Sequence, residues 1–139
     1  RGSIFGINRG TTRAHLARAT IEAMAFQTRD VFHAIERSGV QSITELRVGG
    51  GISAIDLLLQ IQADQLRIPV SRSATKETTG LGAAFFAGLG KGIWNSTEEL
   101  RKLWQDEITV LPSSSATEAD LLYLHWLDAV QRSQKWIKE

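Results

Sequence analysis

Cysteine is absent from this chain. Its absence excludes disulfide bonds, thiolate metal ligands and a cysteine nucleophile, and it is compatible with a reducing compartment. An excess of charge of one sign is also missing, because 16 basic residues are opposed by 15 acidic residues. Because the basic and acidic residues nearly cancel, the net charge gives no electrostatic support for a nucleic-acid partner.

The sequence also lacks long apolar runs and an N-terminal leader pattern. None of its apolar segments approaches the roughly 20 residues that a helix needs to cross a bilayer. No basic segment followed by an apolar one opens the chain, so no signal peptide is predicted. At 139 residues the chain has the size of one domain. We expect a soluble, cytoplasmic domain without a membrane partner, and the start at Arg1 without a methionine suggests a piece of a longer chain.

What the sequence does contain is a short apolar strand followed by three glycines and a helical run, over residues 44–66. The strand is predicted over 44–48 and the helix over 53–66, with Ser53 and Asp56 at the spacing of a capping box. Glycines let the backbone turn tightly and let a ligand approach the main chain. The first N–H groups of a helix lack partners within it and favour anions. The stretch is therefore either a seat for a phosphate or nucleotide, or merely a tight turn.

Helical and extended patterns alternate through the rest of the chain. Helices are predicted over residues 12–37, 81–89, 97–104 and from about 118 onward, and a second strand over residues 69–71. The candidate helix caps are Thr11 or Thr12, Thr78 or Thr79, and Ser96. Residues 2–7 form a short strand or an extended loop. The strand–helix–strand order over 44–71 predicts a parallel pair.

These elements predict an α/β domain with a small, partly parallel sheet. Two short strands cannot cover the faces of one long helix and two apolar ones, so we expect the sheet to be incomplete in this chain. Glycines inside the helix over 81–89 cost about 1 kcal/mol each relative to alanine, which indicates close packing there. Residues 111–117 are polar and unperiodic and are predicted to link the main unit, 1–110, to a C-terminal helix over 118–139.

Few polar residues stand in patterns that carry chemistry. The three histidines (His15, His33 and His125) have no metal-ligand spacing, so structural or surface roles are predicted for them. Asp30, Asp56 and Asp64 fall on predicted helices and not at strand ends, where a general base usually lies in an α/β enzyme. The four tryptophans are interpreted as packing anchors: Trp94, Trp104, Trp126 and Trp136. We predict no catalytic residue and no metal ligand in this chain, which leaves the glycine turn as a binding site.

Two segments near the N-terminus carry a more specific pattern. Gly2-x-Ile4-x-Gly6-Ile7 is followed, after seven intervening residues, by His15-Leu16-x-x-Ala19-Thr20-Ile21-Glu22. This pattern resembles the second signature of the FGGY carbohydrate kinases. Residues 9–11, 22–31, 58–64, 77–84 and 87–89 are similar to the glycerol kinases within that family. The resemblance is close over residues 1–104 and corresponds to the later part of the C-terminal half of such a kinase.

The resemblance implies a ribonuclease H-like (actin-like ATPase) fold with the active site between two halves. It implies ATP and Mg²⁺ as cofactors, with Gly50 and Gly51 in the turn that faces the ATP phosphates and Ile55 at the position near adenine. In such a kinase the catalytic aspartate, most polyol contacts and the magnesium ligands lie outside the segment matched here. The intact parent is expected to transfer the ATP γ-phosphate to glycerol, giving glycerol 3-phosphate, whereas this chain alone is predicted to be inactive.

Two residues depart from the glycerol kinase pattern. Gly49 stands where glycerol kinases usually carry aspartate, and other sugar kinases of the family have three glycines, so another FGGY sugar or polyol kinase is an alternative parent. Ile55 replaces an asparagine, which removes an amide that can bond adenine, so a degenerate, non-catalytic interaction module is a second alternative. The resemblance also implies missing strands beside residues 44–48. We predict self-association through that edge, or poor stability, unless another chain supplies the missing segment.

Overall fold

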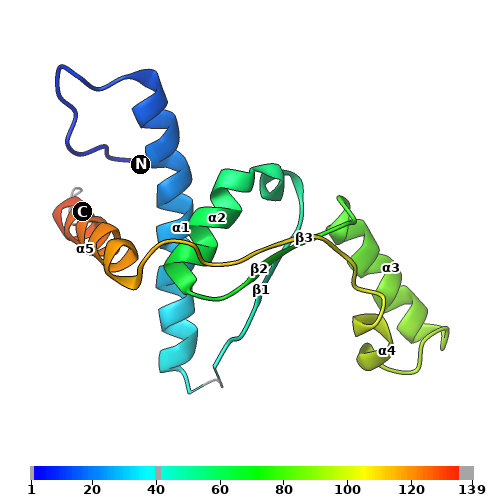
Figure 1. The fold of residues 1–139 in the computed structure, drawn as a ribbon. Helices are drawn as coiled ribbons and strands as arrows, with labels where there is room; N and C mark the ends of the chain where they lie inside the picture. The colour runs from blue at the N-terminus through cyan, green and yellow to red at the C-terminus, as the bar shows by residue number, and fades with distance from the viewer. Residues whose placement is uncertain (1, 40–41, 135–139) are drawn as a thin grey trace, which may run out of the picture.

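The computed structural model describes residues 2–39 and 42–134, and Figure 1 shows their arrangement. In chain order its elements are α1 (Arg13–Arg37), β1 (Leu46–Val48), the 3₁₀ helix η1 (Gly51–Ala54), α2 (Asp56–Leu66), β2 (Val70–Ser73), α3 (Thr78–Gly90), α4 (Thr97–Arg101), β3 (Asp106–Val110) and α5 (Ala116–Ser133). Residues 2–7 form a loop and no strand. None of the helices in the described part of the chain combines the length and hydropathy needed to cross a membrane.

The long helix α1 begins and ends where local signals predicted. Thr12 caps it: the backbone N–H of His15 donates to Thr12 Oγ1 at 3.4 Å, and the N–H of Thr12 donates to His15 Nδ1 at 3.1 Å. His15 thus takes the place that glutamate holds in the usual capping box. The helix ends at Arg37, and Ser38 is its C-terminal cap. The next residue, Gly39, adopts a left-handed φ of 84°.

The sheet has three strands in the order β1–β2–β3. The parallel pairing of β1 with β2 was predicted and is confirmed, with Arg47 opposite Ser71. The antiparallel strand β3 was not predicted, and it pairs Thr109 with Ser71. The helix that was expected to reach residue 104 ends at Arg101. The sequence of β3 has only two alternating apolar residues, Ile108 and Val110, and most of the strand is exposed, so the local pattern is too short to identify it.

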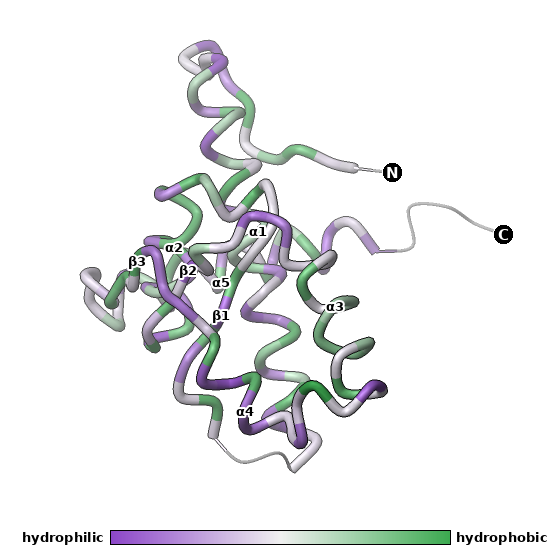
Figure 2. Tube along the Cα trace, turned by 90° about the vertical axis from the view of Figure 1, so that its right-hand side faces the viewer, coloured by the Kyte–Doolittle hydropathy of each residue, from purple (hydrophilic) through white to green (hydrophobic). Residues whose placement is uncertain are grey.

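Helix α2 lies between α1 and the sheet and contributes to a core cluster on each side. Leu58 and Ile61 pack against Ala25 of α1. Leu59 and Ala63, on another face of the same helix, pack against Val70 of β2. Figure 2 shows α1, α2, β1 and β2 close together in the centre of the molecule. The core thus holds the β1–α2–β2 unit, and with it the glycine turn, in place.

The C-terminal helix α5 packs on α1 and α2 through buried polar contacts. Arg29 of α1 donates to Gln65 Oε1 at 2.8 Å and to Asp120 Oδ1 at 2.6 Å, and its guanidinium carbon lies 4.2 Å from the centre of the Tyr123 ring. Arg67 forms a second ion pair with Asp120. Three helices therefore meet around one buried arginine.

The segment before α5 is docked on α2. The backbone N–H groups of Ser113 and Ser114 donate to Asp64 Oδ1 at 2.7 and 3.1 Å. The helix begins at Ala116, two residues before the predicted start, because Ser115 and Glu118 form a capping box. The division into units 1–110, 111–117 and 118–139 stays a prediction, and residues 135–139, with Trp136, lie outside the described part.

Helices α3 and α4 project from the sheet as a separate arm (Figure 1). The prediction that Thr78 or Thr79 caps α3 was wrong, because both residues already have helical geometry and Glu77 precedes them without a side-chain cap. The predicted close packing at the helix glycines holds at Gly88, where an added Cβ would lie 2.1 Å from Trp94 Cζ3. It fails at Gly82, which has open space.

Candidate functional site

The glycine turn connects β1 to α2 through the 3₁₀ helix η1, so α2 begins at Asp56 and not at Ser53. The predicted capping box between Ser53 and Asp56 is wrong. The Ser53 hydroxyl instead donates backward to the carbonyl of Gly50 at 2.6 Å, and the Ser53 N–H donates to the same carbonyl at 3.2 Å. Asp56 pairs with Arg72 of β2 at 2.7 Å. Both side chains therefore stabilise the turn through partners that the capping pattern does not include.

Gly50 and Gly51 play different parts in this turn. Gly50 has φ 87° and ψ 177°, a backbone conformation that only glycine adopts readily. Gly51 opens η1. Among the described residues, the N–H groups of Gly51 and Ile52 donate to no other group. Unpaired N–H groups at the start of a helical segment carry partial positive charge and suit an anion.

Gly49 is required by packing and not by its backbone angles. A Cβ at this position would lie 2.4 Å from Cγ2 of Thr78, at the start of α3. The turn therefore passes directly against the first residue of α3. This is the position at which glycerol kinases usually carry an aspartate. In this structure a side chain at Gly49 has no room unless Thr78 moves.

Ile55 stands between η1 and α2, ending the first and preceding the second. Its side chain is partly exposed, with 36% of the residue's surface accessible, and the nearby Leu57 is exposed to 39%. The side chain offers a hydrocarbon surface beside the turn and no hydrogen-bonding group. Contact with a ligand at this point would be apolar.

Arg72 holds the turn from the neighbouring strand. Its Nη1 donates to the carbonyl of Ser53 at 3.0 Å and to Asp56 Oδ1 at 2.7 Å, while its Nε donates to Glu107 Oε2 at 2.9 Å. The hydrogen bond to Asp56, with the nearby charge of Glu107, raises the pKa of Arg72. Sequence reasoning missed this residue because its partners are distant in sequence and no local motif marks it.

The other polar candidates have structural contacts. Asp30 accepts hydrogen bonds from the Tyr123 hydroxyl and from Trp126 Nε1, which attach α5 to α1. Burial and the hydrogen bond to Asp30 raise the pKa of Tyr123 to about 12. His33 lies between Arg29 and Glu36 on α1. The remaining candidates are placed as follows: Asp64 anchors the segment before α5, His15 completes the cap of α1, and His125 is exposed.

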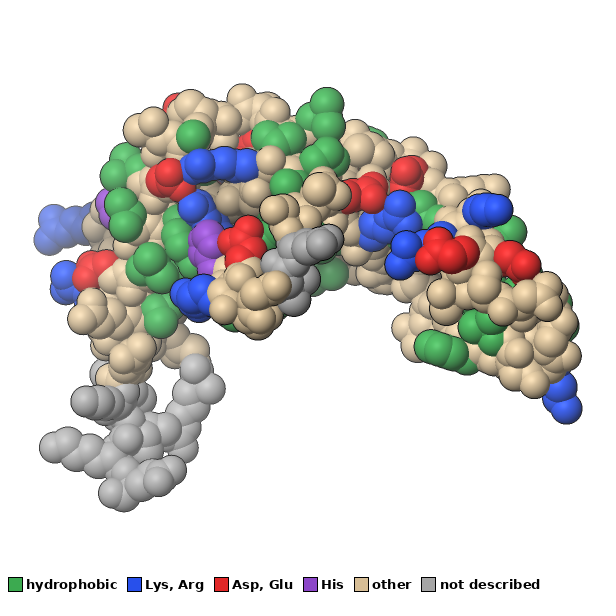
Figure 3. All heavy atoms as spheres, turned by 90° about the horizontal axis from the view of Figure 1, so that it is seen from below, with side chains coloured by type: hydrophobic (Ala, Val, Ile, Leu, Met, Phe, Trp, Pro, Cys, Tyr) green, Lys and Arg blue, Asp and Glu red, His purple; other side chains and the backbone are tan. Residues whose placement is uncertain are grey.

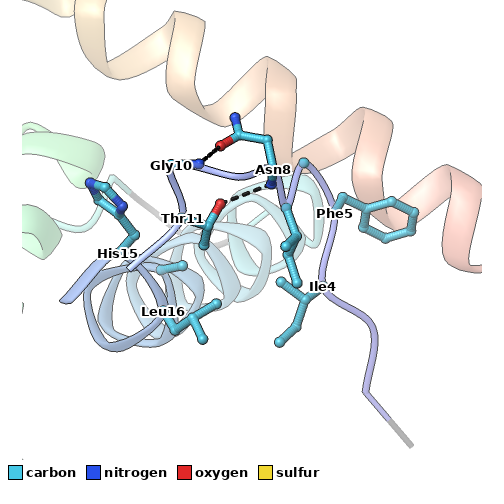
Figure 4. A pocket seen from close by; sticks show the side chains of 10 residues that line it. Ile4, Phe5, Asn8, Gly10, Thr11, His15 and Leu16 are labelled. Carbon is cyan, nitrogen blue, oxygen red and sulfur yellow. Dashed lines mark hydrogen bonds between the residues drawn. The ribbon is translucent and has the colours of Figure 1, made fainter. Parts of the chain in front are cut away.

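Two surface hollows lie away from the glycine turn. One, of about 480 Å³, is formed by the N-terminal loop and the first turns of α1. Figure 4 shows Ile4, Phe5, His15 and Leu16 around it. The other, of about 250 Å³, is lined by Arg47 and by residues of α3 and α4. Neither hollow includes Gly50, Gly51 or Ile55 among its lining residues.

The fold is that of a sugar kinase domain of the actin-like ATPase class. Over 97% of this chain, the structure superimposes on 27% of Plasmodium falciparum glycerol kinase, solved with ADP, at a TM-score of 0.80 and 28% identity. It superimposes on xylulose kinase from Rhodospirillum rubrum at a TM-score of 0.76 and 25% identity, over 91% of this chain and 26% of that one. The α/β, actin-like fold class predicted from the sequence is confirmed.

Residues 1–90 match the model of the C-terminal domain of the FGGY family of carbohydrate kinases, and the chain belongs to this family. It is 49% identical to the glycerol kinase of Dechloromonas aromatica over 136 residues, which make up 98% of this chain and 27% of that protein. The chain thus spans about a quarter of the length of the curated relatives that it matches. The family resemblance drawn from the sequence is confirmed.

Proposed function

We propose that this chain is the nucleotide-binding later part of the C-terminal domain of a kinase that transfers the γ-phosphate of ATP to glycerol, giving glycerol 3-phosphate. The observation that carries the proposal is the 49% identity to a glycerol kinase over 98% of the chain. The remainder of such a parent would supply the catalytic aspartate and most of the polyol contacts. By itself the chain is expected to be inactive.

In this proposal the glycine turn contacts the nucleotide. Gly50 and Gly51 approach the phosphates, and Ile55 lies against the adenine ring. Support comes from the unpaired N–H groups of Gly51 and Ile52, which precede the 11-residue helix α2. The ADP in the Plasmodium falciparum structure supports a nucleotide as the ligand of the parent.

Magnesium is implied by the kinase family but finds no set of ligands here. Within residues 2–39 and 42–134, no three His, Asp or Glu side chains gather where they would hold a metal ion. The described residues therefore offer no site with three protein ligands, and Mg²⁺ in kinases is commonly held by one or two carboxylates together with the phosphates. We assign the ion to the phosphates of ATP and to other parts of the parent kinase.

The proposed partners follow from the same assignment. The parent's N-terminal kinase half would face this chain across the active-site cleft, and both would work in the cytoplasm. Without the strands that would pair with β1 in the parent, the chain is expected to self-associate, because one edge of β1 pairs with no strand among the described residues.

The decisive experiment follows phosphate transfer from labelled ATP to glycerol, xylulose and gluconate. The complete protein that contains these residues is expected to phosphorylate glycerol with the highest kcat/KM. The purified 139-residue chain is expected to form no product above background. A control without protein sets that background.

Other outcomes would replace the proposal with its alternatives. A higher kcat/KM for xylulose or gluconate would make the parent another FGGY sugar kinase. A complete protein that neither binds ATP nor phosphorylates any of the three substrates would favour a non-catalytic interaction module. Glycerol phosphorylation by the 139-residue chain would contradict the assignment of the catalytic residues to the rest of the parent.

A further inference from the structure

Arg72 is the one described side chain that ties the glycine turn, the start of α2 and strand β3 together. It lies on β2, and its side chain is only 14% exposed. Two of its acceptors, the Ser53 carbonyl and the Asp56 carboxylate, lie on either side of Ile55 in the sequence. The guanidinium therefore spans the junction at which η1 ends and α2 begins.

The third acceptor fixes the direction of the guanidinium. Glu107 of β3 accepts from Nε at 2.9 Å, while Nη1 serves both Ser53 and Asp56. A planar guanidinium can serve these separate acceptors at once, whereas a lysine ammonium is a single point of charge. The contact to a backbone carbonyl matters most, because it acts on the path of the main chain and not on a mobile side chain.

The other hydrogen bonds of this segment are local. The Ser53 N–H and hydroxyl donate to the Gly50 carbonyl, the Ile55 N–H donates to the Ile52 carbonyl at 3.2 Å, and the Ile55 carbonyl accepts from the N–H groups of Leu58 and Leu59. These partners lie within four residues of one another, whereas Arg72 holds the segment from β2. The apolar contacts of α2 begin further on, at Leu58 and Leu59. Loss of Arg72 would therefore loosen residues 50–56 while leaving the core of α2 packed.

We propose that Arg72 is a positioning residue for nucleotide binding: it holds residues 50–56 so that the Gly51 and Ile52 N–H groups and the Ile55 side chain face the nucleotide. The inference rests on the proposed function of the glycine turn. Arg72 acts on the backbone of the turn and does not itself contact the phosphates.

The first test is hydrogen exchange of the chain without nucleotide. In Arg72→Gln, the Ser53 and Ile55 amides are expected to exchange about tenfold faster than in the unaltered chain, with Arg72→Lys in between. Amides of Ile61 and Ala63, in the core of α2, should keep their rates. Arg47→Gln is the matched control, since this β1 arginine pairs with Glu45, lies over the Trp104 ring and, among the described residues, donates no side-chain hydrogen bond to residues 50–56.

The second test is steady-state kinetics of the complete protein. Arg72→Gln is expected to raise the KM for ATP about tenfold, while kcat and the KM for glycerol stay within twofold. If Arg72 contacted the phosphates directly, the KM for ATP would rise while the Ser53 and Ile55 amides kept their exchange rates. A positioning role predicts that both change together in Arg72→Gln.

The outcomes separate this inference from the proposed function. Unchanged exchange at Ser53 and Ile55 in Arg72→Gln would overturn the positioning role even if nucleotide binds. A complete, unaltered protein that binds no nucleotide would overturn the proposed function and the inference with it. Should Arg72→Gln unfold the chain, Asp56→Asn decides, because it removes one of the three contacts and should accelerate the same two amides by a smaller factor.

Discussion

The side chain of Ile55 determines what the glycine turn can offer to a base. It is a hydrocarbon at the junction of η1 and α2, partly open to solvent. An asparagine there could donate or accept one hydrogen bond with adenine, and a neutral hydrogen bond contributes about 1 kcal/mol. The present residue limits the site to apolar contact, so its affinity for ATP should be lower than the turn geometry alone would permit.

We predict that Ile55→Asn strengthens ADP binding about fivefold, as one additional hydrogen bond would. Isothermal titration of the complete protein with ADP measures the change. Leu57→Asn is the control, because Leu57 is similarly exposed but lies about 200° further around α2. Equal or weaker binding by Ile55→Asn, or the same gain in Leu57→Asn, would contradict the position assigned to adenine.

The three adjacent glycines show how neighbouring identical residues serve different purposes. Gly50 needs its freedom because its φ is 87° with an extended ψ. Gly49 is small because Thr78 of α3 occupies the space that a side chain would take. Gly51 begins η1 with open space around it. Only Gly51 could accept a Cβ without strain or collision, although it could then block a ligand.

Helix α5 is attached to α1 and α2 by ion pairs in which Asp120 is the common acceptor. Hydrogen bonds from Arg29 and then Arg67 lower the pKa of Asp120. A carboxyl whose pKa is lower in the folded state stabilises the fold above its unfolded pKa of about 3.9. That stabilisation is lost as the pH falls through the folded pKa.

We predict that Asp120→Asn lowers the melting temperature of the chain at pH 7. Below the folded pKa of Asp120 the carboxylate is protonated in the unaltered chain too, so the two melting temperatures should converge as the pH falls below about 4. Thermal unfolding followed by circular dichroism across this range measures the difference.

Asp128→Asn provides the control for this prediction. Asp128 pairs with Arg132 four residues along α5, and both side chains are exposed. Such a surface pair contributes little to stability, so its loss should change the melting temperature only slightly at either pH. An Asp120→Asn effect that is as small, or that persists undiminished in acid, would show that the ion pairs around Arg29 do not anchor α5.

The molecule as a whole exposes more apolar surface than its small core can hide. Phe86 on α3 is 78% exposed and Ile93 is 67% exposed, and Leu124 on α5 is 59% exposed. Figure 3 shows the chain arched from below, with apolar side chains on the surface of the α3–α4 arm at the right. The chain matches 27% of the length of a glycerol kinase relative. Surfaces that pack against the remaining part of such a relative would be uncovered in this chain by itself.

We predict that the chain self-associates through the open edge of β1. The Leu46 N–H donates to the Pro69 carbonyl, just before β2. Because successive N–H groups along a strand point to opposite sides in a regular parallel ladder, the N–H of Arg47 points to the open edge. Arg47→Pro removes that donor without removing a bond to β2, and it should shift the chain toward monomer in sedimentation velocity at increasing concentration.

Arg47→Gln separates the backbone from the side chain in this experiment. It alters the charge but keeps the N–H group, so association should persist. A single monomeric species of the unaltered chain that unfolds cooperatively at all concentrations would contradict self-association. Association that Arg47→Pro leaves unchanged would place the contact on the exposed apolar surface and not at the edge of β1.

Local interactions explain what could be predicted. The cap of α1 at Thr12, its stop at Ser38 and Gly39, and the cap of α4 at Ser96 each involve residues within four positions of one another. The β1–α2–β2 order also predicted a parallel pair, because only a crossover connects parallel neighbours. The resemblance of residues 2–22 to the FGGY signature likewise rests on residues that lie close together in the sequence.

Several of the errors involve partners that are distant in the sequence. Ser53 and Asp56 have the spacing of a capping box, yet Asp56 binds Arg72, 16 residues away. Asp64 anchors a segment 49 residues further on, and β3 becomes a strand by pairing with β2. No local pattern ranks such partners against the nearby ones.

The sequence by itself determined the approximate positions of the helices, the parallel strand pair and the glycine turn, because these depend on short-range hydrogen bonds and spacing. It also determined the family, because the signature residues lie close together in the chain. Tertiary structure decided how the turn is held. It placed Arg72 against the Ser53 carbonyl and Thr78 against Gly49, and it started α2 at Asp56. The physical reason is that hydrogen bonds and close contacts between distant residues arise only when the strands and helices have packed.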